Sequence, residues 1–324
     1  MYNFVIFATP INLYRYIYKD MAIMDNVQIY WEQDELLNML PCLLRKVAGL
    51  HMRLPLPMKK IWYFLATKRI KFENDNPLCF IWHHRFLSQI ENGMVEYLRK
   101  SFPQSKHIYF FTDQWTVNNE SVSFFRNKMD EVAVFDYNIA KKYQMMFLPN
   151  VYPDAEKAVG GGTINYDICF VGHDKGRESD LQAIARLCEK NDIRTAFYIA
   201  RKEGAAEGIR GNIKYIDKKL AYTDVVEIIK SSNCILELNV EPDRSCSLRI
   251  QEAVVWNKKL ITNNRNVENM PCCQNSRWVH YFDKPEDIDW DFVKRNENVD
   301  YQYQGEYSAE NWLRRIEENY QNNI

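Results

Sequence analysis

Short apolar runs of strand length recur along the chain, separated mostly by stretches whose apolar residues follow helical spacing. One such stretch, LSQIENGMVEYLRKSF at residues 87–102, predicts a helix. The strand-length runs form two series, at 2–8, 27–31, 78–83, 107–112 and 131–136, and at 167–172, 195–200, 213–216, 234–240, 259–263 and 278–282. Alternation of this kind predicts βα units and mostly parallel sheets. We therefore expect an α/β protein with two Rossmann-like domains.

The chain has 324 residues, which is more than one hydrophobic core usually supports. Residues 150–167, NVYPDAEKAVGGGTINYD, contain Pro153 and three consecutive glycines and show no hydrophobic period, so they form the best linker candidate. The predicted domains are accordingly 1–150 and 151–306. Residues 307–324 are predicted to form a helix that packs back toward the first domain. Behind Ser308, a candidate cap, apolar residues follow helical spacing: Trp312, Leu313, Ile316 and Tyr320.

The charges nearly cancel, with 42 basic and 43 acidic residues, which argues against a globally cationic nucleic-acid binder. Residues 42–71 differ from the rest, because no acidic residue occurs between Glu35 and Glu73. The cations of this segment lie among Leu, Met, Trp and Phe: Arg45, Lys46, Arg53, Lys59, Lys60, Lys68, Arg69 and Lys71. This mixture suits peripheral contact with an anionic membrane, and equally suits a solvated lysine-rich helix packed through its apolar side.

The sequence shows no recognisable targeting signal or membrane span. The start, MYNFVIFATP, lacks a charged region and a cleavage site, so it is expected to be a core strand and the protein cytoplasmic, with membrane association through residues 42–71. No run of 18 apolar residues exists that could span a bilayer. The eight cysteines show no repeated spacing, and three fall in predicted buried strands. Free thiols and no metal site are therefore predicted.

The pattern of residues 234–264 predicts a buried strand, a polar loop, a helix opening on Ser247 and Arg249, and a second buried strand. The first turn of a helix has unpaired N–H groups and a partial positive charge, to which Ser247 and Arg249 add a hydroxyl and a cation. A diphosphate would fit there. Glu252, one turn beyond Arg249, could accept hydrogen bonds from sugar hydroxyls. Alternatively, Arg249 and Glu252 simply pair with each other on a capped helix.

Several motifs occur in a recognisable order: VFDYNIAKKYQMMFLPNVYP, YDICFVGHDKGR, SLRIQEAVVWNKKLITNN and the terminal NWL helix. Together they resemble bacterial glycosyltransferases of the GT-B fold, more narrowly those of capsule, lipopolysaccharide and exopolysaccharide synthesis. The resemblance covers residues 131–264 and the last helix. It implies two Rossmann-like domains facing across a cleft. The second domain would bind a nucleotide-diphosphate sugar, and the first a glycan or lipid-linked glycan whose hydroxyl receives the sugar, with no cofactor or metal.

Site residues follow from the same resemblance. The loop from Gly172 would face the donor phosphates, with Lys175 and Arg177 as candidate cations. Ser247 and Arg249 fall where the family contacts the diphosphate, and Glu252 where it holds the ribose. The chain departs from the family pattern at Arg244, which replaces both a common glycine turn and the first of a spaced pair of glutamates, so the stereochemical outcome stays open.

A base from the first domain would be needed to activate the incoming hydroxyl. The candidates follow two predicted strands: Asp113 after HIYFF is the first choice and His84 after LCFIW the second. Each residue could instead cap a helix, and strand alternation leaves open whether His83 or His84 faces the core.

Competing readings remain. A metal-dependent GT-A enzyme would need an Asp-x-Asp triplet, but the triplets at 287–289 and 289–291 come late and resemble the first turn of a short helix. A sugar-nucleotide epimerase or polysaccharide pyruvyl transferase could share the layout. So could a non-catalytic scaffold that binds a nucleotide sugar.

Overall fold

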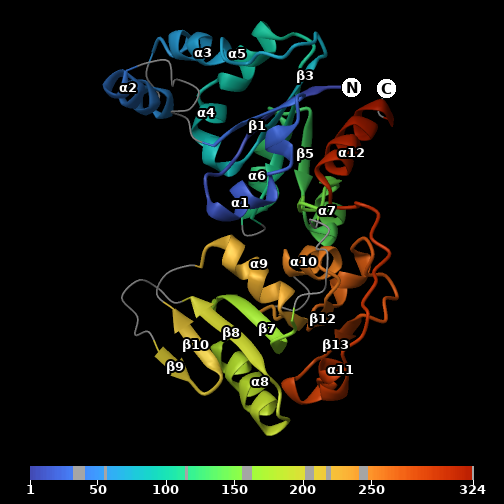
Figure 1. Cartoon of the computed structure of the whole chain (residues 1–324). Helices are drawn as coiled ribbons and strands as arrows, with labels where there is room; N and C mark the ends of the chain where they lie inside the picture. Colours follow the sequence, from blue (N-terminus) through green and yellow to red (C-terminus); the bar gives the residue numbers. More distant parts are fainter. Residues whose placement is uncertain are drawn as a thin grey trace. The chain divides into compact units, whose positions relative to one another are not determined.

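The computed structural model describes residues 1–31, 41–54, 57–113, 116–154, 163–200, 208–216, 220–240 and 247–322. The chain divides into two compact units (Figure 1). Unit 1 comprises Met1–Pro149 and Ala309–Ile324, and unit 2 comprises Asn150–Ser308. Residues 155–162, which include the glycines of the predicted linker, lie outside the described residues.

Unit 1 contains a six-stranded sheet in the order β2-β1-β3-β4-β5-β6. All of its ladders are parallel. The strands are β1 (Asn3–Phe7), β2 (Val27–Tyr30), β3 (Leu78–Trp82), β4 (Lys106–Phe111), β5 (Glu131–Val134) and β6 (Met146–Phe147). The chain moves outward from β1 to β2 and then returns to β3 on the other side of β1. This order is that of a doubly wound sheet, with its switch point between β1 and β3.

The helices of unit 1 are α1 (Asn12–Ile17), α2 (Cys42–Arg53), α3 (Lys60–Thr67), α4 (Leu87–Glu91), α5 (Met94–Ser101), α6 (Asn119–Arg126), α7 (Tyr137–Tyr143) and α12 (Ala309–Asn322). The predicted helical character of residues 87–102 is confirmed, in two helices, α4 and α5, rather than one. Gly93 lies between them with a φ of 88°, a left-handed conformation that breaks the helical path and that glycine adopts without strain.

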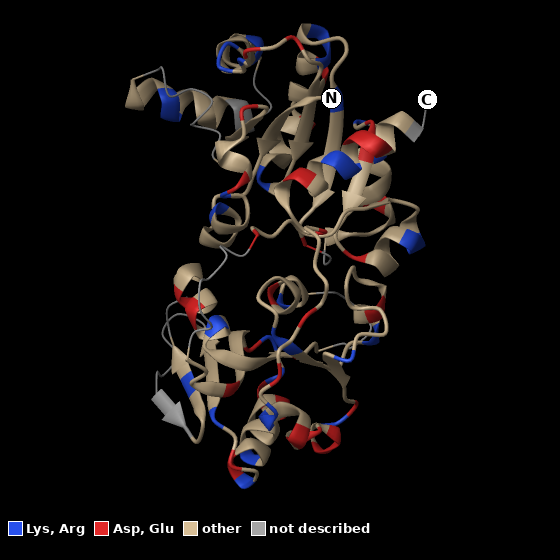
Figure 2. Ribbon diagram, turned by 45° about the vertical axis from the view of Figure 1, so that its right-hand side comes forward, with Lys and Arg blue, Asp and Glu red and all other residues tan. Residues whose placement is uncertain are grey.

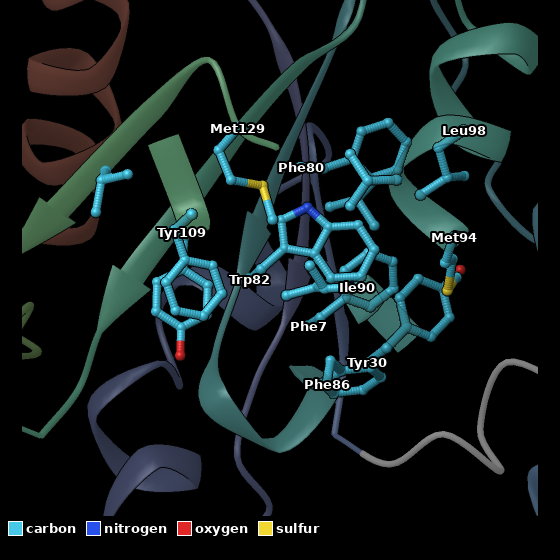
Figure 3. Close-up of a cluster of buried hydrophobic side chains, with 14 of the residues drawn as sticks. Phe7, Tyr30, Phe80, Trp82, Phe86, Ile90, Met94, Leu98, Tyr109 and Met129 are labelled. Carbon is cyan, nitrogen blue, oxygen red and sulfur yellow. The ribbon is translucent and has the colours of Figure 1, made fainter. Parts of the chain in front are cut away.

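Aromatic side chains fill the core of unit 1. Trp82 on β3 lies with its ring centroid 4.3 Å from that of Phe7 on β1, and Phe86 lies 5.0 Å from Phe7 (Figure 3). Helix α12 joins this unit through Trp312, whose indole Nε1 donates to the Pro149 carbonyl at 2.8 Å. The terminal helix is thus held by a buried tryptophan with a satisfied N–H group.

Unit 2 contains a seven-stranded sheet in the order β13-β12-β11-β7-β8-β10-β9. Its strands are β7 (Tyr166–His173), β8 (Thr195–Ala200), β9 (Gly208–Arg210), β10 (Ile213–Ile216), β11 (Ser232–Glu237), β12 (Lys259–Thr262) and β13 (Val279–Tyr281). Without β9, a short antiparallel edge strand, the order is that of the Rossmann fold, with its switch point between β7 and β11.

The helices of unit 2 are α8 (Glu178–Lys190), α9 (Tyr222–Lys230), α10 (Arg249–Val255) and α11 (Trp290–Lys294). Figure 1 shows α8 on one face of the sheet and α9 and α10 on the other. The prediction of two Rossmann-like α/β domains is confirmed by these two sheets. Every predicted strand is present within a few residues of its expected ends, whereas the short edge strands β6 and β9 were not predicted.

The starts of α10 and α11 can be compared with the prediction. Helix α10 begins at Arg249, so Ser247 precedes it rather than opening it. Asp289, in the late acidic segment, caps α11 by accepting a hydrogen bond from the Phe292 N–H at 3.0 Å, in agreement with the predicted short helix. In the described parts of the chain, no helix has the length and apolar character needed to cross a membrane.

Candidate functional site

The carboxyl ends of β7 and β11 meet at the switch point of the unit 2 sheet, the place where ligands of open α/β sheets bind. Arg177, the residue before α8, connects these two strand ends. Its Nε and Nη2 donate to the His173 carbonyl at 3.2 and 2.9 Å, and its Nη1 donates to the Leu238 carbonyl. The buried guanidinium is therefore fixed across the switch point by backbone acceptors.

A second guanidinium lies beside the first. Arg249 begins α10, and its Nη2 donates to the Val171 carbonyl on β7. Both guanidinium groups lie against the ring of Phe170, with Cζ 5.0 Å from the ring centroid for Arg177 and 4.8 Å for Arg249. Phe170 is fully buried. One aromatic ring thus supports both cations through cation–π contact.

Gly172 is necessary for this arrangement for reasons of space. A Cβ atom at position 172 would lie 2.6 Å from Nη2 of Arg249 and 3.4 Å from Nη2 of Arg177. The first separation is shorter than van der Waals contact, so any side chain there would displace the Arg249 guanidinium. The glycine predicted to face the donor phosphates is also the residue that lets both guanidinium groups approach the strand end.

The charge of the pair is not neutralised by a direct partner among the described residues. Burial and the positive charge of Arg249 lower the pKa of Arg177 to about 10, while Asp174 and Glu237 oppose the shift. Arg177 therefore remains charged at neutral pH. In the described parts of unit 2, both guanidinium groups donate to backbone carbonyls and form no ion pair. Cations held this way favour an added anion, since burying an unpaired charge is costly.

Glu237, the last residue of β11, is a member of the site that sequence reasoning missed. It is fully buried. Its Oε1 accepts from the Ser247 N–H at 3.0 Å and its Oε2 from the Thr262 hydroxyl at 2.7 Å. Burial raises its pKa, and the hydrogen bonds from Ser247 and Thr262 and the charge of Arg249 oppose that rise. Glu237 therefore holds the chain that enters α10, and the signal was a lone carboxylate in the apolar run CILELNV.

Glu252 is buried on α10 and accepts a hydrogen bond from the hydroxyl of Tyr222, the first residue of α9. Burial raises its pKa, whereas Arg249 and the Tyr222 hydrogen bond lower it. Among the described residues, the Glu252 carboxylate thus accepts a hydrogen bond from the Tyr222 phenol and forms no salt bridge with Arg249. Burial thus disfavours the charged forms of both Glu237 and Glu252, while the charge of Arg249 favours them.

The remaining unit 2 candidates lie around this pair. Ser247 is half-buried two residues before α10, with its N–H bound to Glu237. Lys175 is exposed on the loop before α8, with a φ of 49°, followed by Gly176 with a φ of 87°. The structure therefore brings together Gly172, Arg177, Arg249 and, through Glu237, Ser247. It leaves Lys175 on the outside of the loop.

In unit 1, His84 and Asp113 are both exposed after the carboxyl ends of β3 and β4. His84 lines a hollow of about 260 Å³ that also includes Tyr109, Glu120 and Phe124. His83 is fully buried, with Nε2 3.1 Å from the Tyr18 hydroxyl, and burial lowers its pKa to about 3. Of the two adjacent histidines, His83 is therefore the neutral core residue and His84 the accessible one.

No protein-family model and no curated protein sequence matches the chain. Among solved structures, it is similar to one described as the glycotransferase of kitacinnamycin, with a TM-score of 0.43 and 7% identity over 98% of this chain and 94% of that chain. It is also similar to an alpha-glucosyltransferase in complex with UDP and a 13-mer DNA containing a HMU base, with a TM-score of 0.45 and 10% identity over 80% of this chain and 78% of that chain. At TM-scores and sequence identities this low, the similarity carries no argument about function.

Proposed function

We propose that the protein is a GT-B-type glycosyltransferase that moves a sugar from a nucleotide-diphosphate sugar to a hydroxyl of a glycan or lipid-linked glycan, in synthesis of cell-envelope polysaccharide. One observation carries the proposal. The guanidinium groups of Arg177 and Arg249 share one buried ring at the switch point of a Rossmann-ordered sheet, without a carboxylate partner among the described residues. Paired cations at that position suit the two phosphates of a nucleoside diphosphate.

The chemistry required of this pair is electrostatic. As the glycosidic bond breaks, negative charge accumulates on the departing diphosphate, and cations fixed in advance stabilise it without reorganising. The backbone hydrogen bonds of Arg177 and the ring contact of both guanidinium groups provide such fixation. Because these side chains supply the positive charge, we propose that transfer requires no metal ion, which would show as activity unchanged by a chelator.

The sugar and its acceptor would be handled by other side chains. Glu252 and Ser247 are proposed to contact the donor, Glu252 at the ribose hydroxyls and Ser247 at the diphosphate, with Lys175 as an outer cation. Asp113 or His84 in unit 1 is proposed as the base that accepts the proton of the incoming hydroxyl. Both are exposed, which leaves them accessible to an acceptor.

The test is a panel of nucleotide-diphosphate sugars incubated with the protein, with release of nucleoside diphosphate as the readout. The wild type is expected to hydrolyse one donor slowly, and to do so faster when its acceptor is present. Arg249→Ala should lose roughly a hundredfold or more of this rate, as happens when a preorganised charge contact is removed from a transition state. Arg249→Lys should recover only part of it, because lysine lacks the planar fork.

Arg186→Ala is the matched control, since it removes an exposed arginine of α8 in the same unit. If Arg249→Ala binds and turns over the donor like this control, the guanidinium pair has no part in the reaction. Conversion of the donor into an isomeric sugar nucleotide, without release of diphosphate, would assign the fold to an epimerase. Tight donor binding with no turnover across an acceptor panel would assign it to a scaffold.

A further inference from the structure

Helix α2 presents its large apolar side chains to the outside. Ala48 is fully buried and Gly49 is buried, whereas Leu43, Val47 and Leu50 are 76%, 52% and 59% exposed. These three residues follow i, i+4, i+7 spacing, so they lie on one side of the helix. An ordinary surface helix buries such a stripe and exposes its polar side. Helix α2 does the reverse, using its smallest residues for the contact with the rest of unit 1.

Helix α3 also exposes large apolar side chains. Tyr63 and Ala66 are buried, whereas Ile61 and Phe64 are 49% and 51% exposed. The two helices are joined by a hydrogen bond from Trp62 Nε1 to His51 Nδ1 at 2.6 Å. We use the name α2–α3 face for the exposed side chains Leu43, Val47, Leu50, Ile61 and Phe64. Large apolar side chains exposed on two helices that contact each other often mark a binding surface.

The charged residues of the segment that carries the face are all basic. No acidic residue occurs between Glu35 and Glu73, and Figure 2 shows α2 with basic but no acidic colouring. Lys46, Lys60 and Lys68 are exposed, and the Lys68 ammonium lies 4.5 Å from the Phe64 ring. Lys59, by contrast, is buried and lies outside this set of cations.

From these observations we infer that the α2–α3 face docks on the surface of an anionic lipid bilayer, with its apolar side chains inserted between lipids and its lysines at the headgroups. Apolar side chains flanked by exposed cations are the chemistry that such a surface recognises. A protein partner would have to be both apolar and acidic over the same area, whereas an anionic bilayer offers both properties everywhere. This inference is independent of the proposed transfer reaction.

The experiment is co-sedimentation of the full chain with phosphatidylcholine vesicles and with vesicles that also contain phosphatidylglycerol. The wild type is expected to bind only the anionic vesicles, and to release them as salt is added. Val47→Glu/Phe64→Glu should weaken binding by about tenfold or more, because a charge cannot be inserted among the lipid chains. Lys46→Gln/Lys60→Gln/Lys68→Gln should weaken it by about a hundredfold, since each cation adds to the attraction.

Two matched variants serve as controls and should bind like the wild type. Ile23→Glu changes an apolar side chain that is 83% exposed in unit 1 but outside the face. Lys141→Gln/Lys142→Gln removes two exposed cations from α7. Thermal unfolding of every variant shows whether the fold is kept.

Equal binding to neutral and anionic vesicles, no binding, or equal loss in the control variants would each overturn the inference. A concentration-dependent dimer that disappears in Val47→Glu/Phe64→Glu would show instead that a second copy covers the face. Binding of nucleoside diphosphate to the same variants should be unchanged, because the guanidinium pair lies in unit 2. Failure of docking and failure of the proposed transfer are therefore read from separate measurements.

Discussion

Both sheets are parallel at their centres and doubly wound, and each has a switch point between two central strands. At the switch point of unit 1, buried His83 contacts the Tyr18 hydroxyl, and the ring of Tyr14 lies 5.4 Å from the imidazole. At the switch point of unit 2, two guanidinium groups lie against Phe170, and the buried acids Glu237 and Glu252 are engaged by hydroxyl donors. Similar topology thus carries neutral groups in one unit and charged groups in the other.

The difference indicates that the switch-point side chains of unit 1 serve packing, whereas those of unit 2 serve ligand binding. Neutral aromatic and imidazole groups satisfy one another with modest hydrogen bonds and need no partner from outside. Like-charged guanidinium groups held close together gain from an anion in direct contact, and no described carboxylate forms an ion pair with either of them. We therefore expect substitutions at the unit 1 switch point to act on stability and substitutions at the unit 2 switch point to act on ligand binding. Four experiments compare the two units, from the largest expected effect to the smallest.

Trp312→Ala should give the largest loss of stability. The indole is buried in unit 1, lies 5.7 Å from the Phe110 ring in an edge contact, and donates to the Pro149 carbonyl at 2.8 Å. Removing a buried tryptophan costs about 3–5 kcal/mol of unfolding free energy. Urea unfolding measures this loss, and Trp312→Phe should recover part of it. Nucleoside diphosphate binding at urea concentrations below the unfolding transition should be retained. Loss of that binding would contradict the expectation that unit 1 affects stability only.

The two buried histidines of unit 1 should make its stability sensitive to acid. Burial lowers the pKa of His83 and of His107 to about 3, well below the value of 6.5 in the unfolded chain. As the pH falls below 6.5, the unfolded chain binds protons that the folded protein does not, so stability is lost until about pH 3. Between about pH 7 and about pH 5 each histidine contributes a loss of about 2 kcal/mol.

Urea unfolding at these two pH values checks this contribution. His83→Asn and His107→Asn should each show a smaller loss between the two values than the wild type does. His84→Asn, which changes an exposed imidazole of the adjacent residue, is the control. An unchanged pH dependence in both buried variants would show that the buried neutral histidines do not lower the stability of unit 1 in acid.

Gly172→Ala should weaken diphosphate binding about tenfold, equivalent to about 1.4 kcal/mol, with little change in unfolding. The added Cβ would lie 2.6 Å from the Arg249 guanidinium, which is the end of a flexible side chain and moves away at little cost. Isothermal titration with a nucleoside diphosphate measures the change. The double variant Gly172→Ala/Arg249→Ala should bind no worse than Arg249→Ala alone. Additive losses would mean that Gly172 acts by another route.

Tyr222→Phe should give the smallest effect, about 1 kcal/mol of unfolding free energy, because one hydrogen bond to a buried carboxyl group is removed. The hydroxyl lowers the pKa of Glu252, which burial raises above its ordinary 4.5. Without that hydroxyl the pKa rises further. Because a raised carboxyl pKa costs stability as pH rises through it, the deficit of Tyr222→Phe should grow from acid toward neutral pH.

Tyr215→Phe is the control for this change, since it removes a hydroxyl that donates to the less buried Glu178 at 2.9 Å. A deficit of Tyr222→Phe that is constant with pH would show that its hydroxyl does not act through the ionisation of Glu252.

The sequence allowed the sheets to be predicted, because the strands are continuous apolar runs that contrast with the helices between them. It also pointed to Gly172, Arg177 and Arg249 by residue type and order. It could not show that Arg177 and Arg249 share the Phe170 ring, since that contact joins side chains far apart in sequence. Nor could alternation decide between His83 and His84, because the strand ends there and a 3₁₀ helix, His84–Phe86, begins.

Glu237 was overlooked for a related reason. A single acid in a strand reads as an imperfection of the apolar pattern, and its partners Ser247 and Thr262 are supplied by segments that meet it only in the fold. The break at Gly93 was likewise hidden, since the apolar spacing of residues 87–102 is compatible with one helix or two.

The ring of Phe170 has a consequence for how the site selects among anions. Since both arginines lie against one buried ring, the fold brings the two positive charges together before any ligand arrives. The protein is thus expected to prefer a diphosphate to an orthophosphate ion, because a diphosphate offers one charged group to each arginine.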